Sequence, residues 1–114
     1  MSEYDIYPEL LMEATRLGHR LFRNNRGVGK YQRRDGTEGF VPFGMAEGAS
    51  DLIGWTMRDG VAVFTAVEVK RPKAHTKKKL LEAQTRFVEA VKKAGGIAGF
   101  VTSTQDYRAL VGAE

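Results

Sequence analysis

Two strand-like segments joined by a two-residue turn constrain the fold of this chain more than any other feature. Residues 51–57 and 61–70 are rich in β-branched, aromatic and other apolar side chains, and Asp59-Gly60 lies between the two segments. Aspartate followed by glycine suits a two-residue hairpin turn, because both turn residues need a positive φ. The pattern therefore predicts an antiparallel hairpin whose pairing can be derived residue by residue.

This turn decides which side chains face each other across the hairpin. With a loop of two residues, the facing pairs run from Arg58–Val61 at the turn to Asp51–Glu68 at the open end. Directly opposed residues share a face of the sheet, with Cβ atoms roughly 4.5–5.5 Å apart. Because side chains alternate along a strand, Lys70 lies on the same face, one step beyond Glu68. A bulge or an extra turn residue would break this pairing.

Two opposed carboxylates repel each other, so the Asp51–Glu68 pair needs a cation nearby. Lys70 supplies one positive charge, but a hard divalent ion suits two carboxylates better. Waters, phosphate oxygens of a substrate and the backbone carbonyl of Val69 are its further candidate ligands. An all-oxygen ligand set favours Mg²⁺ or Mn²⁺ over zinc.

The alternative interpretation of this cluster is a surface ladder of ordinary ion pairs, which adds little stability. The remaining residues of the same face are apolar: Ile53, Trp55, Met57, Phe64 and Ala66. They predict a buried face, with Trp55 and Phe64 in the core. Idle charge at the end of a buried face would be expensive, which favours the metal site.

The rest of the chain predicts helices and strands around this hairpin. An amphipathic helix is expected over residues 3–17, with its regular part starting near Tyr7, because Pro8 is tolerable only in a first turn. Residues 25–49 are expected to form a long loop with room for a short hairpin. The other expected elements are a strand at 21–24, a helix at 76–94, a strand at 97–101 and a helix from Ser103 or Thr104 to Val111.

The order α-β-β-β-α-β-α predicts an α/β fold with a mixed central sheet flanked by helices. A chain of 114 residues fits one compact domain, residues 1–114. The chain has no cysteine, which excludes thiolate metal sites, disulfides and cysteine nucleophiles. It has no apolar run near the roughly 20 residues of a membrane span and no signal-peptide pattern, so a cytoplasmic location without membrane contact is expected. Its scattered glycines form no phosphate-binding signature, and no organic cofactor is expected.

Positive charge is concentrated in two segments that contain no acid. Residues 16–34 hold seven and residues 70–79 hold six of the 18 lysines and arginines, in a chain of net charge +4. Such segments suit a polyanion, because each neutralised phosphate releases counterions. A pair of solvated basic loops is the alternative. The candidate nucleic-acid contacts are Arg23, Arg26, Lys30, Arg71, Lys73 and Lys77.

The ordered motifs of the chain resemble a nuclease family. Gly-Ala-Ser-Asp-Leu-Ile-Gly at 48–54 and Phe-Thr-Ala-Val-Glu-Val-Lys-Arg-Pro at 64–72 resemble the G-x-P-D…E-x-K core of PD-(D/E)XK nucleases, which have a restriction-endonuclease-like fold. More narrowly, the chain is similar to the VRR-NUC (virus-type replication-repair nuclease) domain. Ser50 stands where the family has proline, which stiffens the approach to the aspartate and is not a ligand. The further similarities are Glu3-x-x-Ile6, Arg23-Asn24-Asn25-x-Gly27, Gln84 and Ala94-Gly95-Gly96.

This resemblance implies a role for each matched residue. Asp51 and Glu68 would bind the metal together with the Val69 carbonyl, and Lys70 would orient or deprotonate the attacking water. Gln84 would hold the lysine or the scissile phosphate. Glu3 would reach the site from the first helix, with Glu9 or Glu13 as its alternatives.

The resemblance further implies a Mg²⁺- or Mn²⁺-dependent DNA endonuclease that selects branched or four-way (Holliday) junction DNA. One chain offers one active site and symmetric cutting of a junction takes two, so a homodimer is expected. A phage or prophage origin would fit the small size, by analogy. The alternatives are a non-catalytic nucleic-acid-binding module of the same fold and a small basic structural protein.

Overall fold

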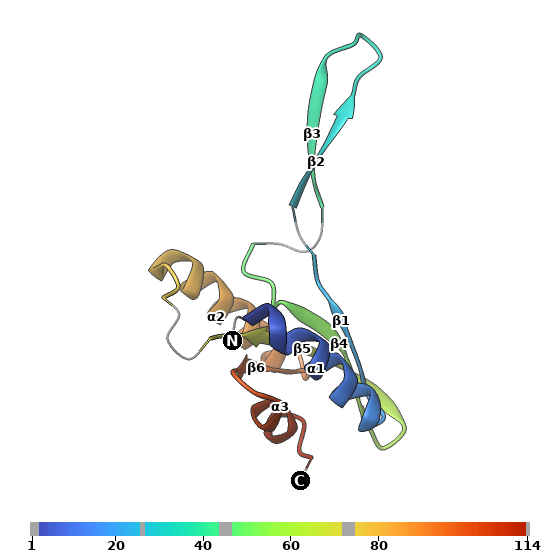
Figure 1. Cartoon of the computed structure of the whole chain (residues 1–114), viewed down its shortest axis with the longest axis vertical. Helices are drawn as coiled ribbons and strands as arrows, with labels where there is room; N and C mark the ends of the chain where they lie inside the picture. Colours follow the sequence, from blue (N-terminus) through green and yellow to red (C-terminus); the bar gives the residue numbers. More distant parts are fainter. Residues whose placement is uncertain (1–2, 26, 44–46, 72–74, 114) are drawn as a thin grey trace.

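A computed structural model describes residues 3–25, 27–43, 47–71 and 75–113 of the chain (Figure 1). Along these residues, helices and strands occur in a mixed α/β order. The elements are α1 (Glu3–Arg16), β1 (Arg20–Arg23), β2 (Gly27–Gln32), β3 (Glu38–Phe43), β4 (Leu52–Arg58), β5 (Val61–Val69), α2 (Lys78–Lys93), β6 (Ile97–Val101) and α3 (Thr104–Leu110).

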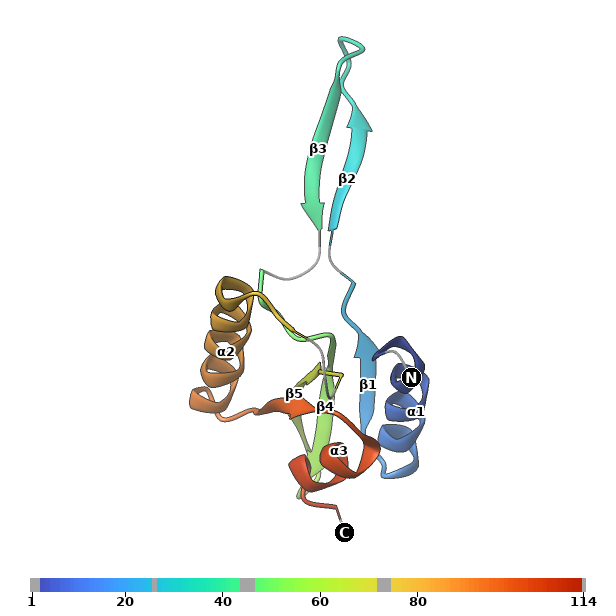
Figure 2. The same cartoon turned by 60° about the vertical axis from the view of Figure 1, so that its left-hand side comes forward.

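The central sheet is mixed and has helices on both faces. Its strand order is β1-β4-β5-β6, with β5 and β6 parallel and the other neighbours antiparallel. Helices α1 and α3 cover one face, and α2 covers part of the other (Figure 2). The mixed sheet flanked by helices is therefore confirmed. Among the described residues, no helix is both long and apolar enough to cross a membrane.

The expected element order was wrong in one place, the segment expected as a long loop. Residues 25–49 contain the two six-residue strands β2 and β3, which pair with each other in a separate two-stranded sheet. The chain therefore has two more strands than the α-β-β-β-α-β-α prediction. Glycines interrupt the apolar alternation of this segment, so its strand periodicity is weak in the sequence.

The β4–β5 hairpin has the pairing that its turn predicted. The partners run from Leu52 opposite Val67 to Arg58 opposite Val61, with no bulge. Asp59 and Gly60 have φ values of 51° and 76°, as a two-residue turn of this hand requires. Turn chemistry and alternation were sufficient here, because the hairpin is local in sequence.

Helix α1 starts earlier than its proline suggested. It begins at Glu3 and includes Pro8, whereas regular helix was expected only from near Tyr7. Proline at this point removes a single backbone hydrogen bond near the helix start. The neighbouring Ile6, Tyr7 and Leu10 are buried against the sheet, which offsets that loss.

The sheet face that carries Glu68 is only half covered, which corrects a second expectation. Near the site, Ala66 packs on Val88 and Val91 of α2. Towards the turn of the hairpin, Trp55 and Phe64 are 36% and 41% exposed, although both were expected in the core. We call the uncovered part the β1–β4–β5 apolar face; its members are Phe22, Trp55, Met57 and Phe64, which are all exposed.

Replacing Gly54 by alanine is expected to destabilise the fold by about 1–3 kcal/mol, the usual range for overpacking. A Cβ atom at this position would lie 2.0 Å from the backbone oxygen of Arg20, so β1 would have to move away from β4. Urea unfolding would measure the loss. Gly99→Ala is the control, because its Cβ would meet only the side chain of Leu110, which can rotate. Equal stability of the Gly54→Ala variant and the original chain would contradict the prediction.

Candidate active site

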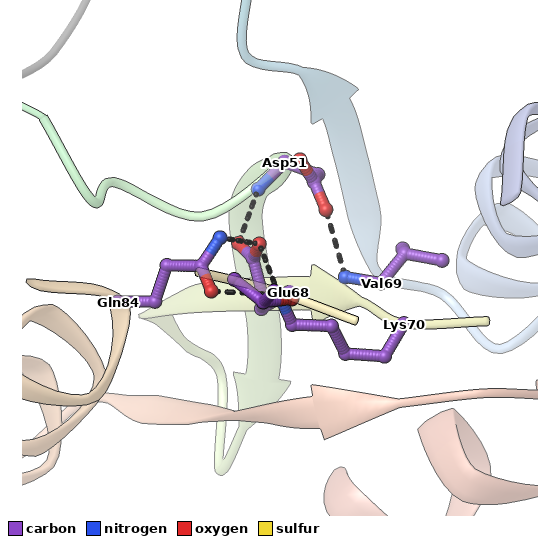
Figure 3. Close-up of polar contacts among 6 residues, drawn as sticks. Asp51, Glu68, Val69, Lys70 and Gln84 are labelled. Carbon is purple, nitrogen blue, oxygen red and sulfur yellow. Dashed lines mark hydrogen bonds and ion pairs between the residues drawn. The ribbon is translucent and has the colours of Figure 1, made fainter. Parts of the chain in front are cut away.

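Asp51 and Glu68 lie close together, Asp51 just before the start of β4 and Glu68 near the end of β5. Asp51 directly precedes β4, and its N–H donates to Oε2 of Glu68 over 3.2 Å (Figure 3). The Glu68 side chain is almost completely buried. The structure thus brings these two predicted residues together at the edge of the α2-covered part of the sheet.

Gln84 links Glu68 to Lys70. Its Nε2 donates to Oε1 of Glu68 over 2.6 Å, and its Oε1 accepts from Nζ of Lys70 over 2.6 Å (Figure 3). These two partners fix the orientation of the Gln84 amide, because the Glu68 carboxylate only accepts hydrogen bonds and the Lys70 ammonium only donates them. Gln84 is buried on the sheet side of α2, so the helix holds the carboxylate and the ammonium at a set separation; Oε1 of Glu68 and Nζ of Lys70 are 3.7 Å apart.

Lys70 has a second acceptor, Thr76, which the sequence did not single out. Nζ of Lys70 donates to Oγ1 of Thr76 over 2.9 Å and lies 5.9 Å from the centre of the Phe100 ring. An open hollow lies beside this ammonium, lined by Lys70, His75, Thr76, Leu81, Thr85 and Phe100. Two of the three N–H groups of Lys70 are therefore used within the chain, and the third remains for a ligand.

The Asp51 carboxylate is held from two further directions. Its Oδ2 accepts from the backbone N–H of Val69 over 2.9 Å, and it also accepts from the hydroxyl of Tyr7 in α1. Burial raises the pKa of Asp51 above its ordinary value, although Val69, the charge of Lys70 and Tyr7 all act to lower it. Burial of the carboxylate thus outweighs these favourable contacts.

Tight contacts place the segment that leads to Asp51. Gly48 has a φ of +88°, and a Cβ there would lie 2.6 Å from the backbone carbon of Ala83, next to Gln84 in α2. Asn24 donates from its backbone N–H to the Asp51 carbonyl over 2.8 Å and from its side chain to the Ser50 carbonyl over 3.0 Å. Only glycine allows the chain to approach the helix so closely at this conformation.

The first helix contributes a tyrosine to the site. Glu13, one expected alternative, instead binds Arg16 of its own helix and Arg108 of α3, and these arginines lower its pKa to about 2. Glu9 is exposed, and the side chain of Glu3 lies outside the described part of the chain. The sequence did not point to Tyr7, because its position fits the apolar side of α1 that packs on the sheet.

The structure describes four of the six candidate nucleic-acid contacts. The guanidinium of Arg23 lies over the ring of Tyr7, 5.0 Å from its centre. Arg71 and Lys77 are exposed, and Lys30 is exposed on β2. Arg26 and Lys73 lie outside the described residues.

The donor set is small but consists of oxygen ligands only. Within residues 3–25, 27–43, 47–71 and 75–113, no group of three or more His, Cys, Asp or Glu side chains is placed to bind a metal. Among these residues, Asp51 and Glu68 are the two carboxylates that the structure brings together. This matches the few carboxylates and several waters with which proteins usually bind Mg²⁺.

Comparison with known proteins identifies one family. The family model described as the VRR-NUC domain matches residues 42–105, more than half of the chain. The matched segment includes Asp51, Glu68, Lys70 and Gln84. No curated protein and no solved structure matches the chain.

Proposed function

The chain belongs to the VRR-NUC family of nucleases, and from this premise we propose that it is a metal-dependent DNA endonuclease of PD-(D/E)XK type, with Asp51, Glu68 and Lys70 at its centre. The observation that carries the proposal is the Glu68–Gln84–Lys70 hydrogen-bond chain beside Asp51. An idle surface ladder would need neither the burial of Glu68 nor a buried amide that orients Lys70.

Asp51 and Glu68 fit a Mg²⁺ or Mn²⁺ ion, with the carbonyl of Val69 as the third protein ligand. The fit rests on the chemistry of the donors: two carboxylates lie side by side, and the Asp51 backbone N–H donates to Oε2 of Glu68. Hard oxygen ligands match these two ions. A metal bound there supplies Lewis-acid stabilisation of the phosphate and lowers the pKa of bound water.

Lys70 is the residue that would contact the scissile phosphate. Its ammonium is held by Gln84 and Thr76, and Lys70 lines the open hollow, so its remaining N–H is available to a phosphate there. A positioned cation stabilises the charge that develops on the phosphate in the transition state. It also orients the attacking water, and removal of a proton from that water is the alternative role for the same atom.

Branched or four-way junction DNA is the proposed substrate, and a homodimer is the proposed form of the enzyme. The support is the β1–β4–β5 apolar face, where Phe22 and Trp55 pack with ring centres 5.7 Å apart and remain exposed. Contiguous exposed apolar patches on soluble proteins mark interaction sites. Two copies joined through this face would present two active sites, as symmetric cutting of a junction requires.

Replacing Phe22 by glutamate is expected to convert the homodimer into a monomer, because the charge would be buried in the apolar contact. Light scattering during gel filtration gives the mass. Phe40→Glu is the matched control: it alters an equally exposed aromatic residue on β3 and should leave the dimer intact. A monomeric original chain at all concentrations would overturn the dimer.

The proposed activity is tested by incubating the purified protein with linear, flap and four-way-junction DNA in Mg²⁺, Mn²⁺ or EDTA. We expect cleavage in either metal, none in EDTA and the highest rate on branched DNA. Salt-sensitive binding without cleavage in any metal would instead support the non-catalytic nucleic-acid-binding module. If the protein neither binds nor cleaves DNA, the remaining interpretation is a small basic structural protein.

Tyr7→Phe is expected to weaken metal binding by about 10–100-fold, the usual scale for a group that orients a metal ligand. Phenylalanine keeps the buried ring and removes only the hydroxyl that donates to Asp51. Calorimetric titration with Mn²⁺ measures the affinity directly, without cleavage. Tyr31→Phe, which removes a hydroxyl from exposed β2, is the control. Unchanged affinity in Tyr7→Phe would show that the hydroxyl does not position Asp51.

A further inference from the structure

The two-stranded sheet of β2 and β3 stands apart from the rest of the protein. Figures 1 and 2 show that it extends away from the body in both views, and it makes the molecule 57 Å long against 35 and 27 Å in the other directions. We call residues 27–43 the β2–β3 ribbon. Its contacts are formed mainly between its own strands.

The β2–β3 ribbon exposes more apolar surface than an isolated hairpin can readily support in water. Val28 and Phe40 on one face, and Tyr31 and Val41 on the other, are each between 46% and 63% exposed. A lone two-stranded hairpin is marginally stable. Exposed apolar side chains along the ribbon indicate a ligand that covers at least one of its faces.

The root of the ribbon is attached to the active site. Asn24, three residues before Gly27 at the start of the ribbon, donates to the backbone carbonyls of Ser50 and Asp51, which lie seven and eight residues after the end of the ribbon at Phe43. A ligand bound along the ribbon would therefore pass beside Asp51.

Positive charge follows the same path. From β1 to the tip, residues 20–34 hold six lysines or arginines and no acid. Arg23 lies above Tyr7 at the site, and Arg33 lies above Tyr31 near the tip, with its guanidinium 5.5 Å from the ring centre. At the tip, Arg34 is exposed. The ribbon also holds Asp35 and Glu38, and the Lys30 ammonium lies 3.7 Å from the Glu38 carboxylate. Over residues 20–43, six cationic and two acidic side chains leave an excess of positive charge, which suits a phosphate backbone.

We propose that the β2–β3 ribbon is a DNA-binding arm that lies in the major groove of the duplex next to the cleaved phosphodiester. This inference rests on the proposed nuclease function and names how that site holds its substrate. The major groove admits a two-stranded β-ribbon. Phe40 then contacts base edges and thymine methyl groups from the face that it shares with Lys30, and Lys30 and Arg34 contact phosphates at the sides of the groove.

The length of the ribbon sets the reach of this contact. Six residues per strand at about 3.3 Å each extend roughly 20 Å. At about 3.4 Å per base pair, the arm covers roughly six base pairs beyond the site. Duplex beyond this point should add no affinity through the arm.

A shortened ribbon tests the proposal. Residues 30–40 are replaced by Asn-Gly between Gly29 and Val41, which face each other, so that the new turn closes the remaining strands. Binding to junctions with arms of 4 to about 20 base pairs is measured in EDTA, so the result does not depend on cleavage. We expect the original chain to bind at least 10-fold more tightly than the shortened variant on long arms, and equally on the shortest.

Point variants give the second measurement. Lys30→Ala/Arg34→Ala should lower the slope of log affinity against log salt by about 1–2, because one or two phosphate contacts are lost. Lys92→Ala/Lys93→Ala, which removes the same charge from the far end of α2, should leave the arm-length dependence unchanged. Thermal unfolding checks that all variants fold.

The outcomes separate this inference from the proposed function. An identical dependence on arm length in the original and shortened chains would overturn the arm. A shortened chain that becomes monomeric and loses affinity equally on every arm length would assign the ribbon to a second copy of the protein, and also overturn it. If the original chain never cuts DNA but binds with the expected arm-length dependence, the arm stands and the nuclease proposal fails.

Discussion

Asp51→Asn should abolish DNA cleavage and, at the same time, raise the melting temperature of the metal-free protein. Cleavage should fall by about 10²–10³-fold or more, the scale for the loss of one preorganised electrostatic contact. Asparagine still accepts the Val69 N–H but no longer places a second charge beside Glu68. Single-turnover cleavage in Mg²⁺ and thermal unfolding in EDTA give the two readouts.

Metal binding supplies an independent check on the same variant. Mg²⁺ should raise the melting temperature of the original chain, because a ligand that binds only the folded state stabilises it. It should leave that of Asp51→Asn nearly unchanged. Active Asp51→Asn protein would indicate a contaminating nuclease, and a lower melting temperature in EDTA would show that Asp51 stabilises the metal-free fold.

The pH dependence of stability follows from the raised pKa of Asp51. Between its unfolded value near 3.8 and the higher folded value, the folded protein binds the proton more tightly than the unfolded chain does. The contribution of Asp51 to stability therefore becomes more favourable as the pH falls through this window, and is lost as the pH rises through the folded pKa. The difference in unfolding free energy between Asp51→Asn and the original chain, measured in EDTA, should shrink as the pH falls.

Lys70→Met should abolish cleavage while leaving metal binding intact. Methionine keeps much of the side-chain stem but lacks the ammonium that Gln84 and Thr76 hold, so the cation facing the phosphate is lost. The Mg²⁺-dependent rise in melting temperature should persist, because Asp51 and Glu68 remain. Lys70→Arg should not restore activity, since the planar guanidinium does not match the geometry of two acceptors around one nitrogen.

Gln84→Ala provides a graded comparison for Lys70. It removes one of the two acceptors and the donor to Glu68 but leaves Thr76, so cleavage should fall only about 10–100-fold. Cleavage by Lys70→Met at the rate of the original chain would exclude an essential role for this lysine. Loss of the Mg²⁺ effect in Lys70→Met would show that the lysine shapes the metal site itself.

Local patterns and one family motif in the sequence were enough to predict the centre of the candidate site. The Asp59-Gly60 turn and period-2 alternation placed Asp51 next to Glu68, because a tight hairpin is a local structure whose register depends on few residues. The same alternation placed Lys70. The helix after the basic loop was also clear from its periodicity, and the family motif indicated Gln84 within it.

Only the tertiary structure decided which other groups reach that centre. Tyr7 contacts Asp51, and Glu13 pairs with Arg108, because α1 packs against the sheet and α3, a placement that no local pattern encodes. Thr76, just before α2, likewise accepts a hydrogen bond from Lys70, a contact that depends on where α2 packs. Trp55 and Phe64 have the pattern of core residues, yet α2 is one helix and covers only part of its face. The alternation of side chains along a strand shows which of them share a face of the sheet. Whether that face is covered depends on the packing of elements that are distant in the sequence.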